Sequence, residues 1–140
     1  MAYFPPAVPG PEPTIEDAVF WSHCAKSELR FQKCASCGRF RHPPSPICRY
    51  CRATEHDWVE ARDEAELFSF TVVNYPSFSG IEPALPYNVA IVRFPSFDNV
   101  RLVSNIVGAE PRELLIGSRL SLIWEDIGPG PKLPRFRASA

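Results

Sequence analysis

Four cysteines in the first half of the chain have the type and spacing to hold a metal ion. Cys34 and Cys37 form one C-x-x-C pair, and Cys48 and Cys51 form a second pair after ten intervening residues. Each pair can form a tight turn that directs two sulfurs to one point, and two such turns complete a tetrahedron around Zn²⁺. Gly38 follows the first pair, where the turn favours a residue tolerant of positive φ. Four thiolates leave no position for a catalytic water, so the pattern predicts a structural zinc site.

Two other uses of these cysteines are open from the sequence. Disulfides would require an oxidising compartment, but no secretory signal is visible, and Cys24 would be left without a partner. A rubredoxin-like iron site is the second alternative, which a red colour would reveal. We therefore expect a cytoplasmic protein, with Cys24 as a buried apolar residue. His23, His42 and His56 lack ligand spacing and are assigned to the surface or to packing.

The composition limits the classes of protein. The chain has 140 residues, of which 45% are hydrophobic and 22% charged, as in a globular protein of one medium or two small domains. No apolar run approaches the ~20 residues of a membrane span. A net charge of −1 and a scarcity of lysine argue against a dedicated nucleic-acid binder. No nucleophile–base pair, glycine-rich phosphate loop or catalytic pair of carboxylates is apparent.

The cysteine pairs require a ribbon of short strands to position them. Residues 29–33 alternate and lead into the first pair, Phe40 lies on the return strand, and Trp58-Val59 closes a zinc ribbon that we place at residues 29–60. Residues 29–54 contain no acid and a basic cluster: Arg30, Lys33, Arg39, Arg41, Arg49 and Arg52. Part of this charge offsets the formal −2 of a zinc tetrathiolate. The remainder could bind phosphates or an acidic partner.

Two segments precede the ribbon. Residues 1–13 carry five prolines and are predicted to be a flexible arm, either a docking arm or a tail. Residues 14–28 are predicted to contain a helix from about Ile15 to about Lys26, with Thr14 as N-cap. Its apolar face includes Phe20-Trp21, which would pack either on the ribbon or on a partner.

Residues 61–140 are predicted to form a five-stranded barrel. Asp63-Glu64 marks a turn, and residues 110–115 form a short helical piece that ends at Gly117. Strands are expected at residues 67–73, 89–94, 100–107, 120–124 and 133–137. Five strands with a helical connection between the third and the fourth match an OB-fold. The fold class is therefore mainly β: an N-terminal helix, a rubredoxin-like zinc ribbon and an OB-fold barrel.

The ordered set of motifs resembles the zinc-ribbon/OB-fold family of acyl-CoA-associated accessory proteins, which partner thiolase-like enzymes. The resemblance covers residues 14–137. It departs from the family at Arg49, where a proline is usual, and at residues 63–66, where a glycine-rich turn is usual. The matching residues are Phe20-Trp21, Leu29, Cys34-x-x-Cys37-Gly38, Pro43-Pro44, Cys48-x-x-Cys51, Phe70-Thr71-Val72-Val73, Pro86-Tyr87, Ile116-Gly117 and Leu133-Pro134-Arg135-Phe136.

The resemblance implies a non-catalytic subunit that binds a thiolase-, hydratase- or synthase-like protein and helps to frame an acyl-CoA channel. Relatives paired with sterol-carrier-type thiolases support thiolytic or retro-aldol cleavage of acyl-CoA side chains, including steroid and aromatic ones. The expected assembly is a heterotetramer, because thiolase-like partners are usually dimers. The expected partner contacts are Phe20, Trp21, Arg39 and Arg41. No activity is expected from the chain alone.

The long loop of residues 75–87 is the expected substrate-channel element. It contains Tyr75, Phe78 and Tyr87, more apolar surface than a solvated loop needs. In one interpretation these side chains form a wall of the acyl channel. In the other they cap the open end of the barrel. A different class of function, a single-stranded nucleic-acid-binding ribbon and OB module, remains the alternative because OB-folds often stack bases on aromatic side chains.

Overall fold

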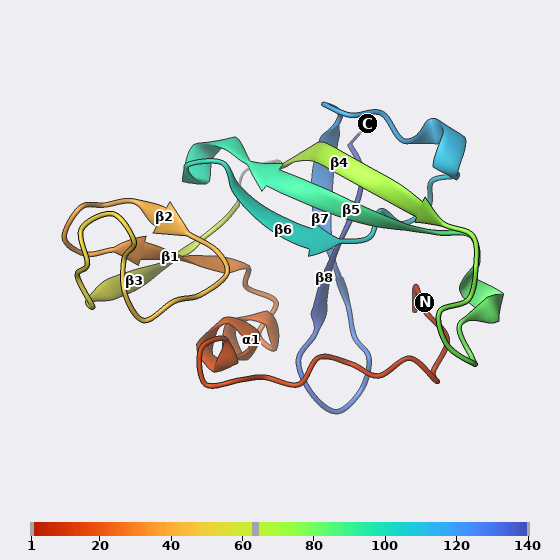
Figure 1. Cartoon of the computed structure of the whole chain (residues 1–140), viewed down its shortest axis with the longest axis horizontal. Helices are drawn as coiled ribbons and strands as arrows, with labels where there is room; N and C mark the ends of the chain where they lie inside the picture. The colour runs from red at the N-terminus through yellow and green to blue at the C-terminus, as the bar shows by residue number, and fades with distance from the viewer. Residues whose placement is uncertain (1, 63–64, 140) are drawn as a thin grey trace.

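The structure, a computed structural model, describes residues 2–62 and 65–139 and contains two antiparallel sheets and one short helix (Figure 1). The first sheet has the order β2-β1-β3 and the second the order β6-β5-β4-β7-β8. The predicted fold class is confirmed. The main elements are α1 (Ala18–Cys24), β1 (Arg30–Cys34), β2 (Phe40–Arg41), β3 (His56–Glu60), β4 (Ala65–Val73), β5 (Tyr87–Phe94), β6 (Val100–Ser104), β7 (Arg119–Glu125) and β8 (Leu133–Ala138).

The helix is shorter than the sequence predicts. It begins at Ala18 because residues 15–17 form a turn, in which the Asp17 carboxylate accepts hydrogen bonds from the backbone N–H and hydroxyl of Thr14. Thr14 therefore does not cap the helix with its own side chain. The exposed side chain of Ile15 has no apolar surface to hold an earlier turn against. At the other end, Ser27 adopts a left-handed φ of 60° and directs the chain into β1.

The ribbon strands agree with the prediction. β1 pairs with β2 through Gln32 and Arg41, and with β3 along its whole length from Arg30 to Cys34. The last residue of β1 is thus Cys34, the first of the four predicted zinc ligands, and the hydrogen-bonded ladder fixes its position.

The second sheet closes into a barrel of OB topology. β4 pairs with both β5 and β7, and an isolated parallel bridge between Ile106 and Phe136 joins the segment just after the third barrel strand to β8. The third strand ends at Ser104, three residues earlier than predicted. Short 3₁₀ turns occupy the connections: η1 (Glu82–Ala84), η2 (Pro95–Phe97) and η3 (Pro111–Glu113). The predicted turn at Asp63-Glu64 lies outside the described residues.

One hydrophobic core runs through the helix, ribbon and barrel. The ring of Phe31 on β1 lies 4.9 Å from the ring of Phe94 and 5.8 Å from that of Phe97. Phe40 on β2 also contacts Phe97, at 4.7 Å between centroids. Phe20 of α1 belongs to the same buried cluster. The boundary that the sequence places at residues 60–61 therefore separates two sheets but does not separate two cores.

The proline-rich arm lies on a surface of its own chain. It runs along the barrel from the side of the residue 75–87 loop towards α1 (Figure 1). Tyr3 donates its backbone N–H to Glu125 Oε1 at 2.8 Å, and its hydroxyl accepts a hydrogen bond from the Asn88 N–H at 3.0 Å. None of the helices in the described ranges has the length and apolar character needed to cross a bilayer.

Candidate functional site

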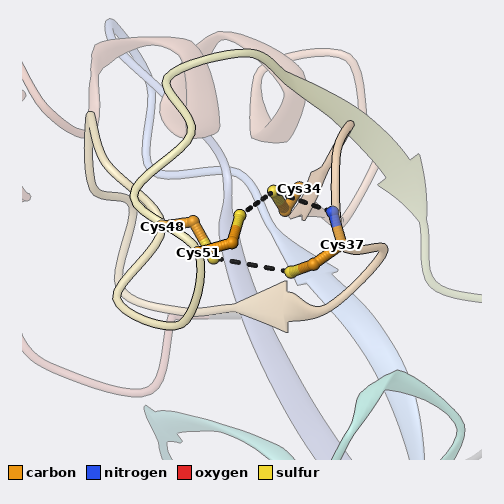
Figure 2. A group of neighbouring side chains, drawn as sticks. All are labelled: Cys34, Cys37, Cys48 and Cys51. Carbon is orange, nitrogen blue, oxygen red and sulfur yellow. Dashed lines mark hydrogen bonds between the residues drawn. The ribbon is translucent and has the colours of Figure 1, made fainter.

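The four cysteines converge on one point between the two turns of the ribbon (Figure 2). All four Sγ atoms lie within 4.8 Å of one another, with Cys34–Cys51 at 3.5 Å and Cys37–Cys48 at 3.7 Å. A tetrahedral site with Zn–S bonds of about 2.3 Å places its sulfurs about 3.8 Å apart. The donor set and its spacing therefore fit Zn²⁺ without rearrangement of the backbone.

The two turns have the same backbone shape. Gly38 donates its N–H to the Cys34 carbonyl at 3.0 Å, and Arg52 donates to the Cys48 carbonyl at 2.8 Å. Both residues are left-handed, with φ of 77° for Gly38 and 64° for Arg52. The sequence indicates this conformation at Gly38. Arginine rarely adopts a left-handed conformation. The only signal for it at Arg52 is that this residue follows the second C-x-x-C pair as Gly38 follows the first.

The backbone of the turns favours thiolates. The amide of Cys37 lies 3.4 Å from Cys34 Sγ, and this hydrogen bond is the largest of the causes that lower the pKa of Cys34 to about 6. The amide of Cys51 likewise lowers the pKa of Cys48. The amide of Arg39 acts in the same direction on Cys37, but burial and the three neighbouring thiols outweigh it and raise the pKa of Cys37 to about 11. The lowered pKa values of Cys34 and Cys48 favour the thiolate, which is the form that binds metal. Cys34 and Cys48 are buried while Cys37 and Cys51 are exposed, so one side of the centre faces solvent.

Cys24 is separate from the metal centre. Its side chain lies in the core, and burial raises the pKa of the thiol to about 12. A thiol in this state is unreactive. The structure thus places Cys24 as the sequence predicts, as a small apolar packing residue.

The expected partner residues fall into a buried group and an exposed group. Phe20 is 3% exposed and packs in the core, so in this conformation its side chain offers no surface to a partner. Trp21 contacts the Phe20 ring edge-on at 5.1 Å and stays half-buried at the surface of α1. Arg41 donates two hydrogen bonds to the Ser45 carbonyl and so holds the loop before the second turn. Arg39 is exposed.

Arg39 and Arg49 flank the exposed ring of Tyr50. Their guanidinium carbons lie 4.0 Å and 4.8 Å from the ring centroid. Arg49 also donates a hydrogen bond to the Tyr50 hydroxyl at 2.6 Å, which lowers the pKa of that hydroxyl. This basic, aromatic surface lies on the ribbon beside the metal centre.

The expected channel residues lie at the opposite end of the barrel from the ribbon (Figure 1). Tyr75 is 84% exposed and Phe78 is 44% exposed, whereas Tyr87 is half-buried at the start of β5, where Phe4 of the arm packs against it at 5.1 Å. The structure therefore does not bring the channel residues near the basic ribbon surface.

A buried polar cluster escaped the sequence analysis. Arg135 on β8 is 9% exposed, donates to Asn105 Oδ1 at 2.6 Å and pairs with Glu125 at 3.4 Å. Asn88 bonds both backbone groups of Ile106 with its side chain. In the alternation of β8, Arg135 shares a face with Leu133 and the exposed Arg137, opposite to the core residue Phe136. The sequence pattern therefore gives no signal for a buried charge at this position.

A zinc ribbon followed by an OB-fold barrel, with four convergent thiolates and one shared core, defines a two-module zinc-ribbon/OB-fold protein. Residues 21–57 match the family profile described as "ChsH2, rubredoxin-like zinc ribbon domain", and residues 58–125 match "ChsH2, C-terminal OB-fold domain". The chain belongs to this ChsH2 (DUF35) family. The family profile and the four cysteines together support zinc as the metal.

Individual relatives agree with this assignment. A probable enoyl-CoA hydratase alpha subunit from Thermomonospora curvata is 38% identical over 129 residues, which are 91% of this chain but 39% of that protein. The solved structure of an "Ltp2-ChsH2(DUF35) aldolase" has a TM-score of 0.83 and 33% identity, covering 94% of this chain and 100% of that one. A DUF35 protein of unknown function from Sulfolobus solfataricus, at 21% identity and a TM-score of 0.66, shares the fold.

Proposed function

We propose that this chain is a non-catalytic accessory subunit of a thiolase-like enzyme that acts on acyl-CoA. The observation that carries the proposal is the match along almost the whole chain to a structure described as an Ltp2–ChsH2(DUF35) aldolase. The similarity to a probable enoyl-CoA hydratase alpha subunit points to the same class of thioester substrate. In this role the chain helps to assemble the complex and to shape the acyl channel. The reaction is thiolytic or retro-aldol cleavage of acyl-CoA side chains, including those of steroid and aromatic substrates.

Two surfaces would carry the role. Trp21 and the ribbon surface around Arg39 and Arg41 would contact the partner, and the exposed residues Tyr75 and Phe78 would form one wall of the channel, flanked by Tyr87. The exposure of Tyr75 and Phe78 supports this use, because two large side chains in water gain free energy when a partner covers them. The complex would act in the cytoplasm, where a zinc tetrathiolate stays reduced.

Co-expression with a thiolase-like subunit tests the proposal. We expect a stable complex with two copies of each chain, measured by size-exclusion chromatography with light scattering. Acyl-CoA turnover is expected from the complex and not from this chain alone. Separate species across micromolar concentrations, or full turnover by either subunit alone, would contradict the accessory role.

One feature favours the alternative of a single-stranded nucleic-acid module. Phe68 lies on β4, and Arg101 of β6 lies 3.9 Å from its ring, a combination of aromatic and cation that OB-folds use to stack bases. Fluorescence titration with single-stranded oligonucleotides at several salt concentrations tests it. Binding that weakens steeply with salt would support this function, and no binding in low salt would exclude it.

A further inference from the structure

The part of the residue 75–87 loop that precedes β5, residues 75–86, has few attachments of its own to the barrel. In the described part of the chain, its hydrogen bonds join loop residues only to one another: Gly80 to Glu82, Ile81 to Phe78, Ala84 to Ile81 and Leu85 to Glu82. Ile81 is 2% exposed, yet it lies outside the main core cluster. Something beside the barrel core must therefore hold the loop in place.

The N-terminal arm contacts this loop in its middle and at the end where it enters β5. A Cβ added to Gly80 would lie 3.0 Å from the Cβ of Ala7, so the backbone of the loop runs directly against the arm. Phe4 packs edge-on against Tyr87, where the loop enters β5. The Tyr3 hydroxyl accepts the N–H of Asn88, the next residue along β5.

The arm is anchored at its N-terminal end by the buried polar cluster. The Arg135 guanidinium lies 5.7 Å from the Tyr3 ring and 5.5 Å from the Phe4 ring, and Glu125, its ion-pair partner, accepts the Tyr3 N–H. Further along, the arm spans a cavity of about 830 Å³ whose lining includes Val8 and Ile127. Since Tyr3 and Phe4 carry both of these hydrogen bonds and the ring contacts of the arm, their contacts should dominate its attachment.

We propose that residues 2–13 form an intramolecular strap, latched by Tyr3 and Phe4 on Arg135, which holds the loop of residues 75–86 in position. Tyr3, Phe4 and Arg135 are then positioning residues: they touch no substrate and act through the loop. The consequence for acyl-CoA selection rests on the proposed function. The strap itself does not, because it exists in the isolated chain.

Amide hydrogen exchange of the zinc-loaded full-length chain, resolved by NMR, tests the strap without any partner. The informative amides are those of Ala84 and Leu85, because they donate to carbonyls of the loop itself, those of Ile81 and Glu82. In Phe4→Ala we expect their exchange to accelerate by about tenfold or more as the loop opens locally. Pro6→Ala is the matched control, because Pro6 is exposed in the same arm, and it should leave both rates unchanged.

A second variant keeps the result interpretable. Removal of residues 1–10 should accelerate the same two amides, while the amide of Val92 at the centre of β5 stays protected and shows that the barrel is folded. A synthetic peptide of residues 2–13 should restore protection, and the same peptide with Phe4→Ala should not. If the exchange rates of Ala84 and Leu85 are unchanged in both variants and only the amide of Asn88 exchanges faster, the arm protects only the amide that it binds. The proposal that it holds the loop would then be wrong.

The assembled complex then separates the two proposals. If the strap positions the loop in the complex, Phe4→Ala should change the preference among acyl-CoA chain lengths. The change should have the same direction as the one caused by Tyr75→Ala. Faster loop exchange with no complex formation would retain the strap and reject the proposed function. Complex formation together with unchanged loop exchange in Phe4→Ala would support the proposed function and reject the strap.

Discussion

At the scale of single residues, the zinc ligands are the part of the molecule most open to test. Replacing Cys37 by Ser removes one of the four thiolates, so the chain should lose its zinc. In comparable ribbons zinc binding contributes about 10 kcal/mol or more to the free energy of folding. We expect close to one zinc per chain in the parent and almost none in Cys37→Ser, measured by elemental analysis. Ser36→Ala, in the same exposed turn, is the control and should retain metal. Ordered, metal-free parent protein would contradict the zinc centre.

His42 predicts a specific pH dependence of stability. Its ring lies between Phe20 and Phe31, at 5.0 and 5.3 Å, and burial lowers the pKa of the imidazole to about 4, with Asp17 opposing the shift. Between the folded pKa of about 4 and the unfolded value of 6.5, the unfolded chain binds more protons. Stability is therefore full above pH 6.5 and falls as the pH drops, by about 2 kcal/mol at pH 5.

Urea unfolding at pH 7.5 and pH 5 measures this loss. His42→Phe should remove the part of the pH dependence that belongs to the imidazole, whereas loss of zinc at acid pH is common to both proteins and cancels in the difference. An unchanged pH dependence in His42→Phe would assign it to the thiolates instead.

At the scale of elements, the residue 75–87 loop distinguishes a channel wall from a barrel cap. Tyr75 is almost fully exposed, so Tyr75→Ala should leave the melting temperature within about 1 °C of the parent, since surface substitutions rarely change stability. In the assembled complex it should change the preference among acyl-CoA chain shapes. Ile81→Ala, by contrast, truncates a buried side chain of the same loop and should lower the free energy of unfolding by about 2–5 kcal/mol.

Phe78, at 44% exposure, is the deciding residue. As a wall it should behave like Tyr75, and as a cap it should behave like Ile81. A clearly lower melting temperature for Phe78→Ala with unchanged specificity in the complex would establish the cap.

The elements also show where sequence reasoning works and where it stops. The cysteine spacing and the strand alternation predict the ribbon and all five barrel strands, because metal geometry and a two-residue period are local properties. The ends of α1 depend on Asp17 and Ser27, whose local hydrogen bond and backbone conformation are not specified by the apolar pattern. The position of the arm depends on Arg135 and Glu125, more than a hundred residues away along the chain, and no local pattern reveals such a contact.

At the scale of the whole molecule, the shared core predicts cooperative unfolding. Phe31 belongs to the ribbon but packs on Phe94 and Phe97 of the barrel side, so Phe31→Ala should destabilise both modules by about 3–5 kcal/mol. Variants that keep a single tryptophan, Trp58 in β3 or Trp124 in β7, report each module separately. We expect the two fluorescence transitions to coincide in urea, before and after the Phe31 change.

Two separated transitions would contradict a shared core. They would indicate a ribbon that melts while the barrel remains folded, as the sequence boundary at residue 60 suggests. For the same reason, the structure leads us to expect that zinc removal lowers the stability of the barrel as well as the ribbon.

The shared core also limits how this chain can be inherited. A recombination break between the two family domains, at residues 57–58, would expose Phe31 on one product and Phe94 with Phe97 on the other. Helix, ribbon and barrel should therefore pass between genes as one unit. The relative from Thermomonospora curvata fits such a history, since the matched region makes up 39% of a longer chain and includes both modules. We expect genomes to contain the zinc ribbon and the OB-fold barrel of this family together, alone or fused to other domains, and rarely one without the other.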